Sequence, residues 1–396
     1  MKKKVGIVTH YYNSYNYGGL LQSYALVKEL EKLNYEAYQI ACKTPFEDSL
    51  FKNIIRHFYV FFKIRLTKDR RNRLLRKKTK KRKEACSLFM KKINHSKPYR
   101  KGTIKNCLKD FSIFITGSDQ VWNPDWVKSA YYLSFVPDKF LKIAYAASIG
   151  KIDLTQKELT YAVPKINRLD YISVREQEAK DILKPFINKE IKVVLDPTFL
   201  LTQKDWDLVS TPVLIDNSYI FVYLLGNNKV HRKTIKKYAK KLDLKIVFLP
   251  HIHFQYEPAD ENFADIDLYD IGPAEFVGLI EKAKMVITDS FHGCVFSIIY
   301  HKKFWALKRH KDSEKENMNS RLYTLFSNLG LDERLLEDDA ELSKEELLAE
   351  IDYNVVNEKL EVLRKDSVDF LENALSESVK IIEKNQENKG TKKFEN

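Results

Sequence analysis

Polar side chains interrupt an apolar stretch in the second half of the chain, MVITDSFHGCVFSIIY at residues 285–300. A strand is predicted to end there and a helix to begin, and Asp289 or Ser290 can cap the helix. The free N–H groups and the positive end of the helix dipole favour a bound phosphate or carboxylate. Gly293 lets such a ligand approach the backbone, and the anion would raise the pKa of His292. His292 is therefore predicted to be a proton donor near neutral pH.

A second group of polar residues follows the strand predicted at residues 111–117, FSIFITG. Ser118, Asp119 and Gln120 come directly after it, and Trp122 stands two positions later. A carboxylate, an amide and an indole plane are groups that grip sugar hydroxyls and stack on a pyranose face. These four residues are therefore candidates for binding a sugar.

Further candidates stand at other predicted junctions. Asn16, Gly18 and Gly19 separate the first predicted strand from its helix, although a glycine pair is only a weak signal for phosphate or sugar. Cations that could hold an anion are Arg175, Lys308, Arg309 and Arg321.

Each junction also has a structural interpretation. Asp289 or Ser290 can be only a cap with His292 as its partner, and Ser118 or Asp119 can cap a helix in the same way. A single arginine is more often a solvated surface residue than a clamp on a ligand. Several arginines that converge on one cleft are harder to explain by solvation alone.

Short apolar runs alternate with helical patterns along most of the chain, which predicts parallel sheets covered on both faces. The expected strands are residues 4–10, 35–40, 111–117, 142–150, 171–176, 219–226, 245–250, 285–290 and 304–308. The predicted fold class is α/β, with two doubly wound Rossmann-like domains facing a cleft and C-terminal helices after them. A cleft at the carboxyl ends of the strands would bring the polar junctions together.

The series of strands breaks near Asp196-Pro197, which sets the expected domains. They are an N-terminal domain at 1–190 with an insertion at about 51–105, a C-terminal donor-binding domain at 191–335, and helices with a charged tail at 336–396. The acidic stretch from Glu337 to Glu383 is expected to be helical and amphipathic, and the residues after it to be frayed.

Composition narrows the class of protein. The four cysteines are scattered without a CxxC pair, which argues against a zinc site or disulfides and for a reducing compartment. No apolar run reaches the roughly 18–20 residues of a spanning helix, and the start of the chain is too quickly polar for a signal peptide. We expect a cytoplasmic protein with neither a cofactor nor a metal.

Positive charge is concentrated in one segment. Between Lys63 and Lys83 there are 13 Lys or Arg and one Asp, which supplies +12 of the net charge of +14. Aromatic and aliphatic bulk at residues 51–66 precedes this run, a pattern typical of a helix lying on an anionic bilayer. The segment 51–83 is therefore predicted to contact the inner face of the membrane peripherally. The alternative is a solvated helix whose apolar face packs on its own domain.

Taken together, these motifs resemble the polysaccharide pyruvyl transferase family. The resemblance is carried, in the same order, by HYYNSYNYGGLLQSYAL, ITGSDQVWNP, AYAASIG, ISVREQEAKDIL, VLDPTFLL, ITDSFHGCVFSIIYHKKFWAL and NSRLYTLFSNLGL, over roughly residues 4–335. Members of this family resemble GT-B glycosyltransferases in fold. They transfer a pyruvyl group from phosphoenolpyruvate to sugar hydroxyls of cell-surface polysaccharides and form a ketal.

The resemblance implies roles for the candidate residues. His292 would be the general acid and Asp119 would accept a proton from the sugar. The donor would be held by Ser290 and Gly293 at the helix start and by Arg175, Arg309 or Arg321. Many members have Arg two positions before the His where this chain has Ser290, so Arg309 or Arg321 would have to replace that cation.

The remaining candidate residues are those that would contact the acceptor, and two rival functions stay open. The acceptor, in many pathways linked to a lipid carrier, would contact Asn16, Gly18, Gly19, Ser118, Gln120 and Trp122. A glycosyltransferase with a nucleotide-sugar donor is the nearest rival, and Glu275 and Asp289 are its acidic candidates for a ribose. Nucleic-acid binding through the basic run is the other rival, and we expect none.

Overall fold

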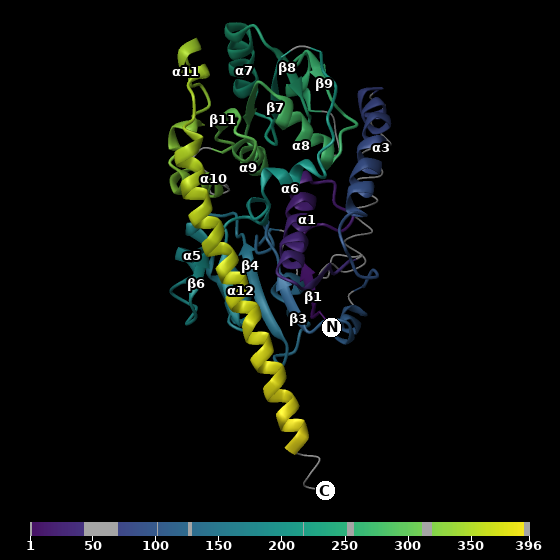
Figure 1. The fold of residues 1–396 in the computed structure, drawn as a ribbon. Coiled ribbons are helices and arrows are strands. Elements are labelled where there is room, and N and C mark those ends of the chain that lie inside the picture. Colours follow the sequence, from purple (N-terminus) through teal and green to yellow (C-terminus); the bar gives the residue numbers. More distant parts are fainter. Residues whose placement is uncertain are drawn as a thin grey trace.

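The computed structural model describes residues 2–42, 70–100, 102–125, 129–216, 218–251, 257–310 and 319–391. Two parallel six-stranded sheets dominate these ranges, and helices cover both faces of each (Figure 1). The predicted fold class is confirmed. Residues 194–218 join the two sheets, so the change of sheet lies close to Asp196-Pro197.

The first sheet has the order β2-β1-β3-β4-β5-β6. Its strands are β1 Lys4–Val8, β2 Glu36–Gln39, β3 Ile113–Thr116, β4 Leu141–Ala147, β5 Tyr171–Val174 and β6 Ile191–Val193. All residues of β3 and β4 are buried, because a parallel sheet packed on both faces needs continuous apolar runs. The segment after helix α3 runs parallel to the end of β2 and the residues after it. Isolated β-bridges pair Gln39 with His95 and Cys42 with Tyr99.

The second sheet has the order β12-β11-β10-β7-β8-β9. Its strands are β7 Tyr219–Tyr223, β8 Lys245–Phe248, β9 Ile266–Asp267, β10 Met285–Thr288, β11 Lys303–Leu307 and β12 Leu335–Leu336. Renumbered from β7, this is the Rossmann order 3-2-1-4-5-6, whose direction reverses between β7 and β10. The sequence patterns missed β6, β9 and β12, which are edge strands of two or three residues.

Helices connect the strands and cover the sheets. The α-helices are α1 Tyr17–Lys32, α3 Arg70–Met90, α4 Gln156–Ile166, α5 Gln177–Leu183, α6 Gln203–Asp207, α7 Lys229–Leu242, α8 Pro273–Lys282, α9 Phe291–Ile299, α10 Ser320–Leu329, α11 Lys344–Leu348 and α12 Tyr353–Thr391. Short 3-10 helices are Ile104–Lys109, Ser129–Tyr132, Pro197–Phe199, Pro258–Asp260 and Asp332–Arg334.

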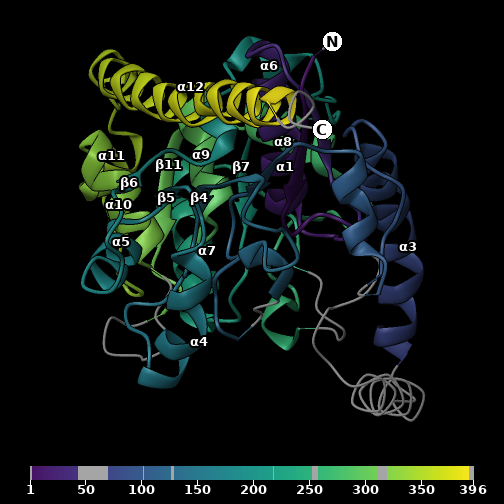
Figure 2. The same ribbon diagram turned by 90° about the horizontal axis from the view of Figure 1, so that it is seen from below.

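Helix α12 returns from the second half of the molecule to the first and lies along it (Figures 1 and 2). The backbone N–H of Leu195 donates to Ser367 Oγ at 2.9 Å, and Arg364 Nε donates to the carbonyl oxygen of Phe199 at 2.7 Å. The helix extends to Thr391, and the fraying expected after Glu383 stays a prediction.

Helix α3 follows β2 in sequence but also contacts the second half of the molecule, on the flank away from α10 and α11 (Figures 1 and 2). The Arg82 guanidinium is buried and donates to the carbonyl oxygens of Pro250, Leu268 and Tyr269 at 2.8–3.2 Å. Tyr17 lies under this guanidinium and donates to the carbonyl oxygen of Ile271 at 2.7 Å. The end of the basic run is therefore partly a brace between the two halves.

The predicted membrane-contact segment lies largely outside the described residues, which resume at Arg70 after Cys42. Within the described part of the chain, no helix combines the length and the apolar character that crossing a membrane requires.

Candidate active site between the two sheets

A cavity of about 890 Å³ lies where the carboxyl ends of the two sheets face each other. From the first half, the start of α1 contributes Asn16 and Gly18, and the loop after β3 contributes Asp119 and Gln120. From the second half, the lining includes the loop after β7, the start of α9 and side chains beyond β8 and β11. The cavity therefore meets the point of strand-order reversal between β7 and β10, where ligands of such sheets bind.

Helix α9 begins at this cavity with a side-chain cap. Ser290 Oγ accepts from the backbone N–H of Gly293 at 3.4 Å, and Thr288 Oγ1 donates to the carbonyl oxygen of Tyr223 at 2.5 Å. A Cβ added to Gly293 would lie 2.6 Å from Thr288 Oγ1. The absence of a side chain at Gly293 thus lets α9 pack against β10. Gly293 does not line the cavity, and its predicted contact with a ligand stays a prediction.

His292 reaches across from α9 to the first half of the molecule. Its side chain is 10% exposed, and its Nε2 lies 3.8 Å from Asp196 Oδ2. Nε2 is buried without a hydrogen-bond partner among the described residues. A Cβ on Gly18 would lie 2.0 Å from His292 Nδ1, so only glycine leaves room for the ring.

The pKa of His292 is lowered in the ligand-free protein, whereas the sequence argument expected an elevated pKa with an anion bound. Burial is the main cause, and the positive charges of Arg175 and Arg321 act in the same direction. Asp196 and Asp119 oppose the shift without cancelling it. The imidazole is therefore neutral near pH 7 until a further negative charge arrives.

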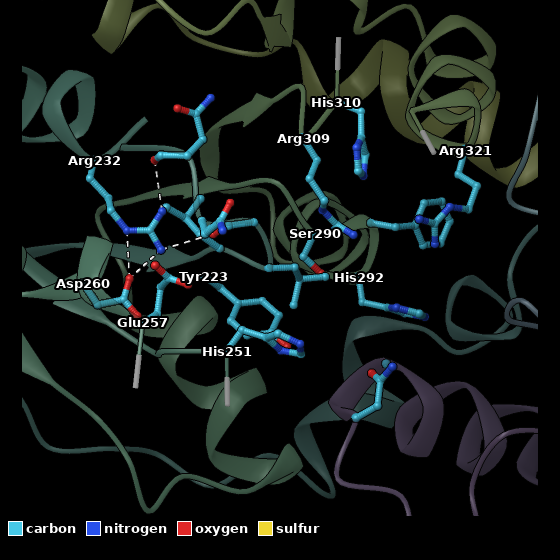
Figure 3. Close-up of a pocket in the computed structure, with 18 of the residues that line it drawn as sticks. Tyr223, Arg232, His251, Glu257, Asp260, Ser290, His292, Arg309, His310 and Arg321 are labelled. Carbon is cyan, nitrogen blue, oxygen red and sulfur yellow. Dashed lines mark hydrogen bonds and ion pairs between the residues drawn. The ribbon is translucent and has the colours of Figure 1, made fainter. Parts of the chain in front are cut away.

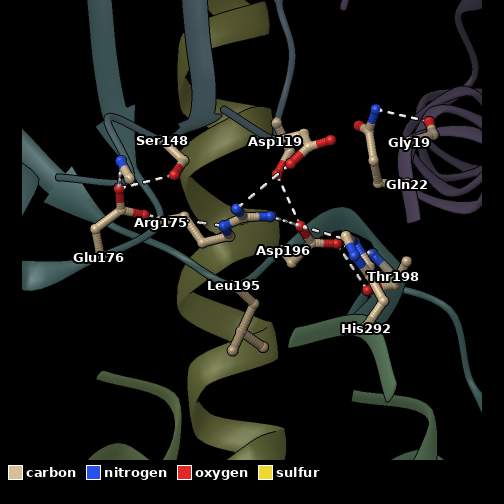
Figure 4. A network of polar contacts seen from close by, with 12 residues as sticks. Gly19, Gln22, Asp119, Ser148, Arg175, Glu176, Leu195, Asp196, Thr198 and His292 are labelled. Atoms are coloured by element: carbon tan, nitrogen blue, oxygen red, sulfur yellow. Dashed lines mark hydrogen bonds and ion pairs between the residues drawn. The ribbon is translucent and has the colours of Figure 1, made fainter. Parts of the chain in front are cut away.

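Asp196 is the centre of a buried polar network between the two halves (Figure 4). Its Oδ2 accepts from Arg175 Nη1 at 2.7 Å and from Ser118 Oγ at 2.8 Å. Its Oδ1 accepts from the N–H and the hydroxyl of Thr198 at 3.0 and 2.7 Å. Burial alone would raise the pKa of Asp196, but His292, Arg175 and these hydrogen bonds lower it to about 2. Asp196 is thus a fixed negative charge beside His292.

Asp119 lies at the end of β3 with a left-handed backbone, φ 67°. Its carbonyl oxygen accepts from the N–H groups of Val121 and Ser148 at 2.7 and 3.1 Å, which holds this conformation. Burial would raise the pKa of the side chain, but Arg175 and His292 outweigh it and keep the pKa below its ordinary value. Asp119 therefore faces the cavity as a carboxylate.

Two arginines line the same end of the cavity as His292 (Figure 3). Arg309 Nη2 donates to the carbonyl oxygen of Asp289 at 2.9 Å. Arg321 Nε is buried without a hydrogen-bond partner in the described part of the chain. Burial, followed by the charges of Arg175 and Arg309, lowers the pKa of Arg321 to about 9. The ligand-free protein holds these cations at an energetic cost that a bound anion would relieve.

The opposite end of the cavity belongs to the second half of the molecule (Figure 3). Arg232 Nε and Nη2 donate to Asp260 Oδ1 at 2.8 and 2.5 Å. The same guanidinium donates to the carbonyl oxygens of Asn228 and Gly226 at 3.1 Å, which fixes the loop after β7. Glu257 lines this end and caps a short helix by accepting from the N–H of Ala259 at 3.2 Å.

The structure brings eight of the thirteen predicted site residues to the cavity and not the other five. The lining includes Asn16, Gly18, Asp119, Gln120, Ser290, His292, Arg309 and Arg321 but not Gly19, Ser118, Trp122, Arg175 and Gly293. Trp122 is 2% exposed, and its ring stacks on Tyr132 with an interplanar angle of 4°, so the indole is part of the core. Ser118 and Arg175 are engaged with Asp196, and a side chain on Gly19 would meet the carbonyl oxygen of His10.

Sequence reasoning missed Asp196, Arg232, Glu257 and Asp260. Asp196 lies three residues after the end of β6 and directly before a proline, and a polar residue just beyond an apolar run was the available signal. The acidic residues considered for a ribose are otherwise engaged. Glu275 Oε2 accepts from the N–H of Gly272 at 3.1 Å.

Asp289, the other of those two acids, accepts from the N–H groups of Leu225 and Gly226 at 2.6 and 2.8 Å. Among the described residues, no group of three or more His, Cys, Asp or Glu could hold a metal ion.

Comparisons with solved structures agree with this architecture. UDP-GlcNAc 2-epimerase from Methanocaldococcus jannaschii is similar with a TM-score of 0.53 and 15% identity, over 92% of this chain and 93% of that chain. Arabidopsis thaliana UGT89C1 complexed with UDP-L-rhamnose is similar with a TM-score of 0.52 and 9% identity, over 96% and 99%. At such identities the likeness shows the shared GT-B-type fold alone. No curated protein matches the sequence.

The family model for polysaccharide pyruvyl transferase matches residues 16–311. That match spans most of the chain, from the loop before α1 to the residues after β11, and it includes every cavity-lining residue except Arg321 and Asp338. The resemblance seen in the sequence is thereby confirmed. This chain belongs to the polysaccharide pyruvyl transferase family, and it is a transferase.

Proposed function

We propose that the protein transfers the pyruvyl group of phosphoenolpyruvate to two hydroxyls of a cell-surface polysaccharide or its lipid-linked precursor. The cationic end of the cavity is the observation that supports phosphoenolpyruvate as the donor. His292, Arg309, Arg321 and the N-terminus of α9 meet there, and burial with like charge depresses the pKa of Arg321 to about 9. A small ligand with two anionic groups relieves this unfavourable arrangement most effectively.

We assign the phosphate to the start of α9 and the carboxylate to the arginines. The first turn of a helix has N–H groups without intrahelical partners, and its dipole favours an anion. Arg309 and Arg321 supply planar guanidinium groups that can hold a carboxylate through paired hydrogen bonds. They thus take the place of the arginine that many family members have where this chain has Ser290.

The imidazole of His292 then supplies the proton that starts the reaction. Donor binding adds negative charge beside it, which raises its pKa and loads it with a proton. Transfer of that proton to the methylene carbon of phosphoenolpyruvate leaves an oxocarbenium-like centre at C2. The first sugar hydroxyl adds to C2 while Asp119 accepts its proton.

Departure of phosphate completes the ketal. Cleavage of the bond between C2 and the phosphate oxygen regenerates an electrophilic centre, and the second hydroxyl oxygen adds to it. The two hydroxyls release two protons in all. Asp119 passes the first proton to the departing phosphate and the second returns to His292, so the enzyme is restored and the products are the ketal and hydrogen phosphate.

The test uses the full chain with candidate lipid-linked saccharides, with and without phosphoenolpyruvate. We expect one phosphate released for each pyruvyl ketal found by mass spectrometry, and thermal stabilisation by phosphoenolpyruvate alone. A donor present at about 100 times its dissociation constant stabilises by about 2.7 kcal/mol. Stabilisation by a nucleotide sugar but not by phosphoenolpyruvate would favour a glycosyltransferase and contradict the proposal.

Residues 51–83 are the part of the chain that we propose to contact an anionic membrane, which would place the enzyme at the inner face beside a lipid-linked acceptor. Lys80, Lys81 and Lys83 are exposed on α3, whereas Arg82 is buried. Deletion should therefore be limited to residues 51–69, so that the Arg82 brace remains. The deletion removes the aromatic bulk and five of the cations, so it should weaken sedimentation with phosphatidylserine vesicles and leave turnover of a soluble acceptor intact. Unchanged sedimentation would contradict the membrane contact.

A further inference from the structure

We propose that the end of the cavity opposite Arg309 and Arg321 is a subsite for an uncharged vicinal diol, with Glu257 as its specificity-determining residue. Asn228, Arg232, Glu257 and Asp260 define this end, called here the diol subsite. The inference rests on the proposed function, because it assigns the cationic end to the donor.

The size of the cavity leaves room for a second occupant. Phosphoenolpyruvate is a three-carbon phosphate ester, whereas cavities of about 300–1,000 Å³ hold ligands of drug size. At about 890 Å³ the cavity is near the top of that range. A donor held between α9 and Arg321 leaves the part bounded by Glu257 and Asp260 to another group, since Figure 3 places these two acids on the side of the pocket away from Arg321.

The two ends of the cavity have opposite electrostatic character. At one end Arg309, Arg321 and the start of α9 outweigh the carboxylate of Asp119, and Glu257 and Asp260 line the other end. The one guanidinium at the acidic end, Arg232, is bound to Asp260 and to two carbonyl oxygens. Burial raises the pKa of Asp260, against the opposing charge of Arg232, and Glu257 raises it further, so added negative charge is unfavourable there. Phosphate or carboxylate is therefore disfavoured at this end, and a neutral group is favoured.

The hydrogen-bonding groups of the subsite suit hydroxyls. Glu257 uses Oε1 to cap the N–H of Ala259, which leaves Oε2 as an acceptor. Asn228 uses Oδ1 to accept from the N–H of Val230 at 2.8 Å, which leaves its amide NH₂ as a donor. A hydroxyl both donates and accepts, so two adjacent hydroxyls match one carboxylate oxygen and one amide. Arg232 keeps Asn228 and Asp260 in place for this contact.

Two sources of such a diol exist, a sugar unit of the acceptor and the ribose of a nucleotide sugar. Saturation-transfer NMR with lactose, in the presence of phosphoenolpyruvate, probes the first source. The same measurement with UDP-N-acetylglucosamine probes the second. Both are applied to the wild type, Glu257→Ala, Glu257→Gln and the control Glu358→Gln, which alters an exposed carboxylate on α12 outside the cavity lining.

We expect Glu257→Ala to reduce the contact signal of one probe at least fivefold, Glu257→Gln to reduce it less, and Glu358→Gln to leave it unchanged. The probe affected identifies the source of the diol. Thermal stabilisation by phosphoenolpyruvate should be the same in all four proteins. If Glu257→Ala keeps the full contact signal of both probes, the proposed diol subsite is wrong. If phosphoenolpyruvate fails to bind the wild type while a probe still depends on Glu257, the donor assignment fails and the subsite stands.

Discussion

At the scale of single residues, the imidazole of His292 joins the two halves of the molecule. It comes from α9, and its charged neighbours Asp196 and Asp119 follow strands of the first sheet. Replacement by glutamine removes the proton donor and keeps a polar side chain of similar size. We expect His292→Gln to lower kcat by about 10²- to 10⁴-fold, measured as phosphate release. The exposed His301→Gln should retain full activity, and equal losses in both variants would contradict the assignment.

The protonation state of His292 should also depend on the donor. Burial lowers the pKa of His292 in the free protein, and the bound anion raises it. At a pH between these two pKa values, binding of the donor therefore takes up a proton. The dissociation constant of phosphoenolpyruvate should therefore increase as pH rises through that window, by up to about tenfold per pH unit. Calorimetry in two buffers of different ionisation enthalpy measures the proton uptake.

The donor phosphate also titrates, and His292→Gln separates the two effects. The titration of free phosphoenolpyruvate is common to both proteins, so the difference between their pH profiles reports the imidazole. Identical proton uptake in the wild type and His292→Gln would show that His292 does not gain the proton.

At the scale of elements, the start of α1 is built to receive a side chain from α9. Asn16 Oδ1 caps α1 by accepting from the N–H of Gly19 at 3.3 Å, and this turn places Gly18 against the His292 ring. In Gly18→Ala the new methyl group would lie 2.0 Å from Nδ1, which forces the ring or the helix to move. A displacement of about 1 Å at a catalytic group can cost about 10²-fold in rate.

We therefore expect Gly18→Ala to lower kcat by about 10²-fold, measured well below the melting temperature of the variant. Gly102→Ala is a matched control, because a Cβ there meets nothing within 4 Å. Wild-type kcat in Gly18→Ala would mean that the His292 ring has room to move without loss of function.

At the scale of the whole molecule, Arg82 on α3 braces the second half against the first through three carbonyl oxygens. Loss of the guanidinium leaves buried acceptors without partners, and hydrogen bonds to charged groups contribute about 1.5–3 kcal/mol. We expect Arg82→Ala to lower the free energy of unfolding by at least about 2 kcal/mol in urea titrations. The exposed neighbour Lys81→Ala should change it by less than about 0.5 kcal/mol. Similar losses of unfolding free energy in the two variants would show that Arg82 does not brace the two halves.

The sequence by itself determined the fold class and the position of the cavity. Strands such as β3 and β10 are buried on both faces, so each is a continuous apolar run, and the polar residue after each run marks the carboxyl edge of a sheet. The short edge strands β6, β9 and β12 have too few residues to produce such a pattern. Eight predicted residues reach the cavity because they follow a strand or begin a helix at that edge.

Only the tertiary structure decided which way those polar side chains face. Arg175 and Ser118 turn toward Asp196, and Trp122 turns into the core, because a buried carboxylate requires partners and a large ring gains most from burial. Glu257 comes from the loop between β8 and β9, which contains none of the thirteen predicted site residues, so no local pattern connects it to them. Side-chain direction and loop convergence depend on contacts between distant segments, which spacing along the chain does not encode.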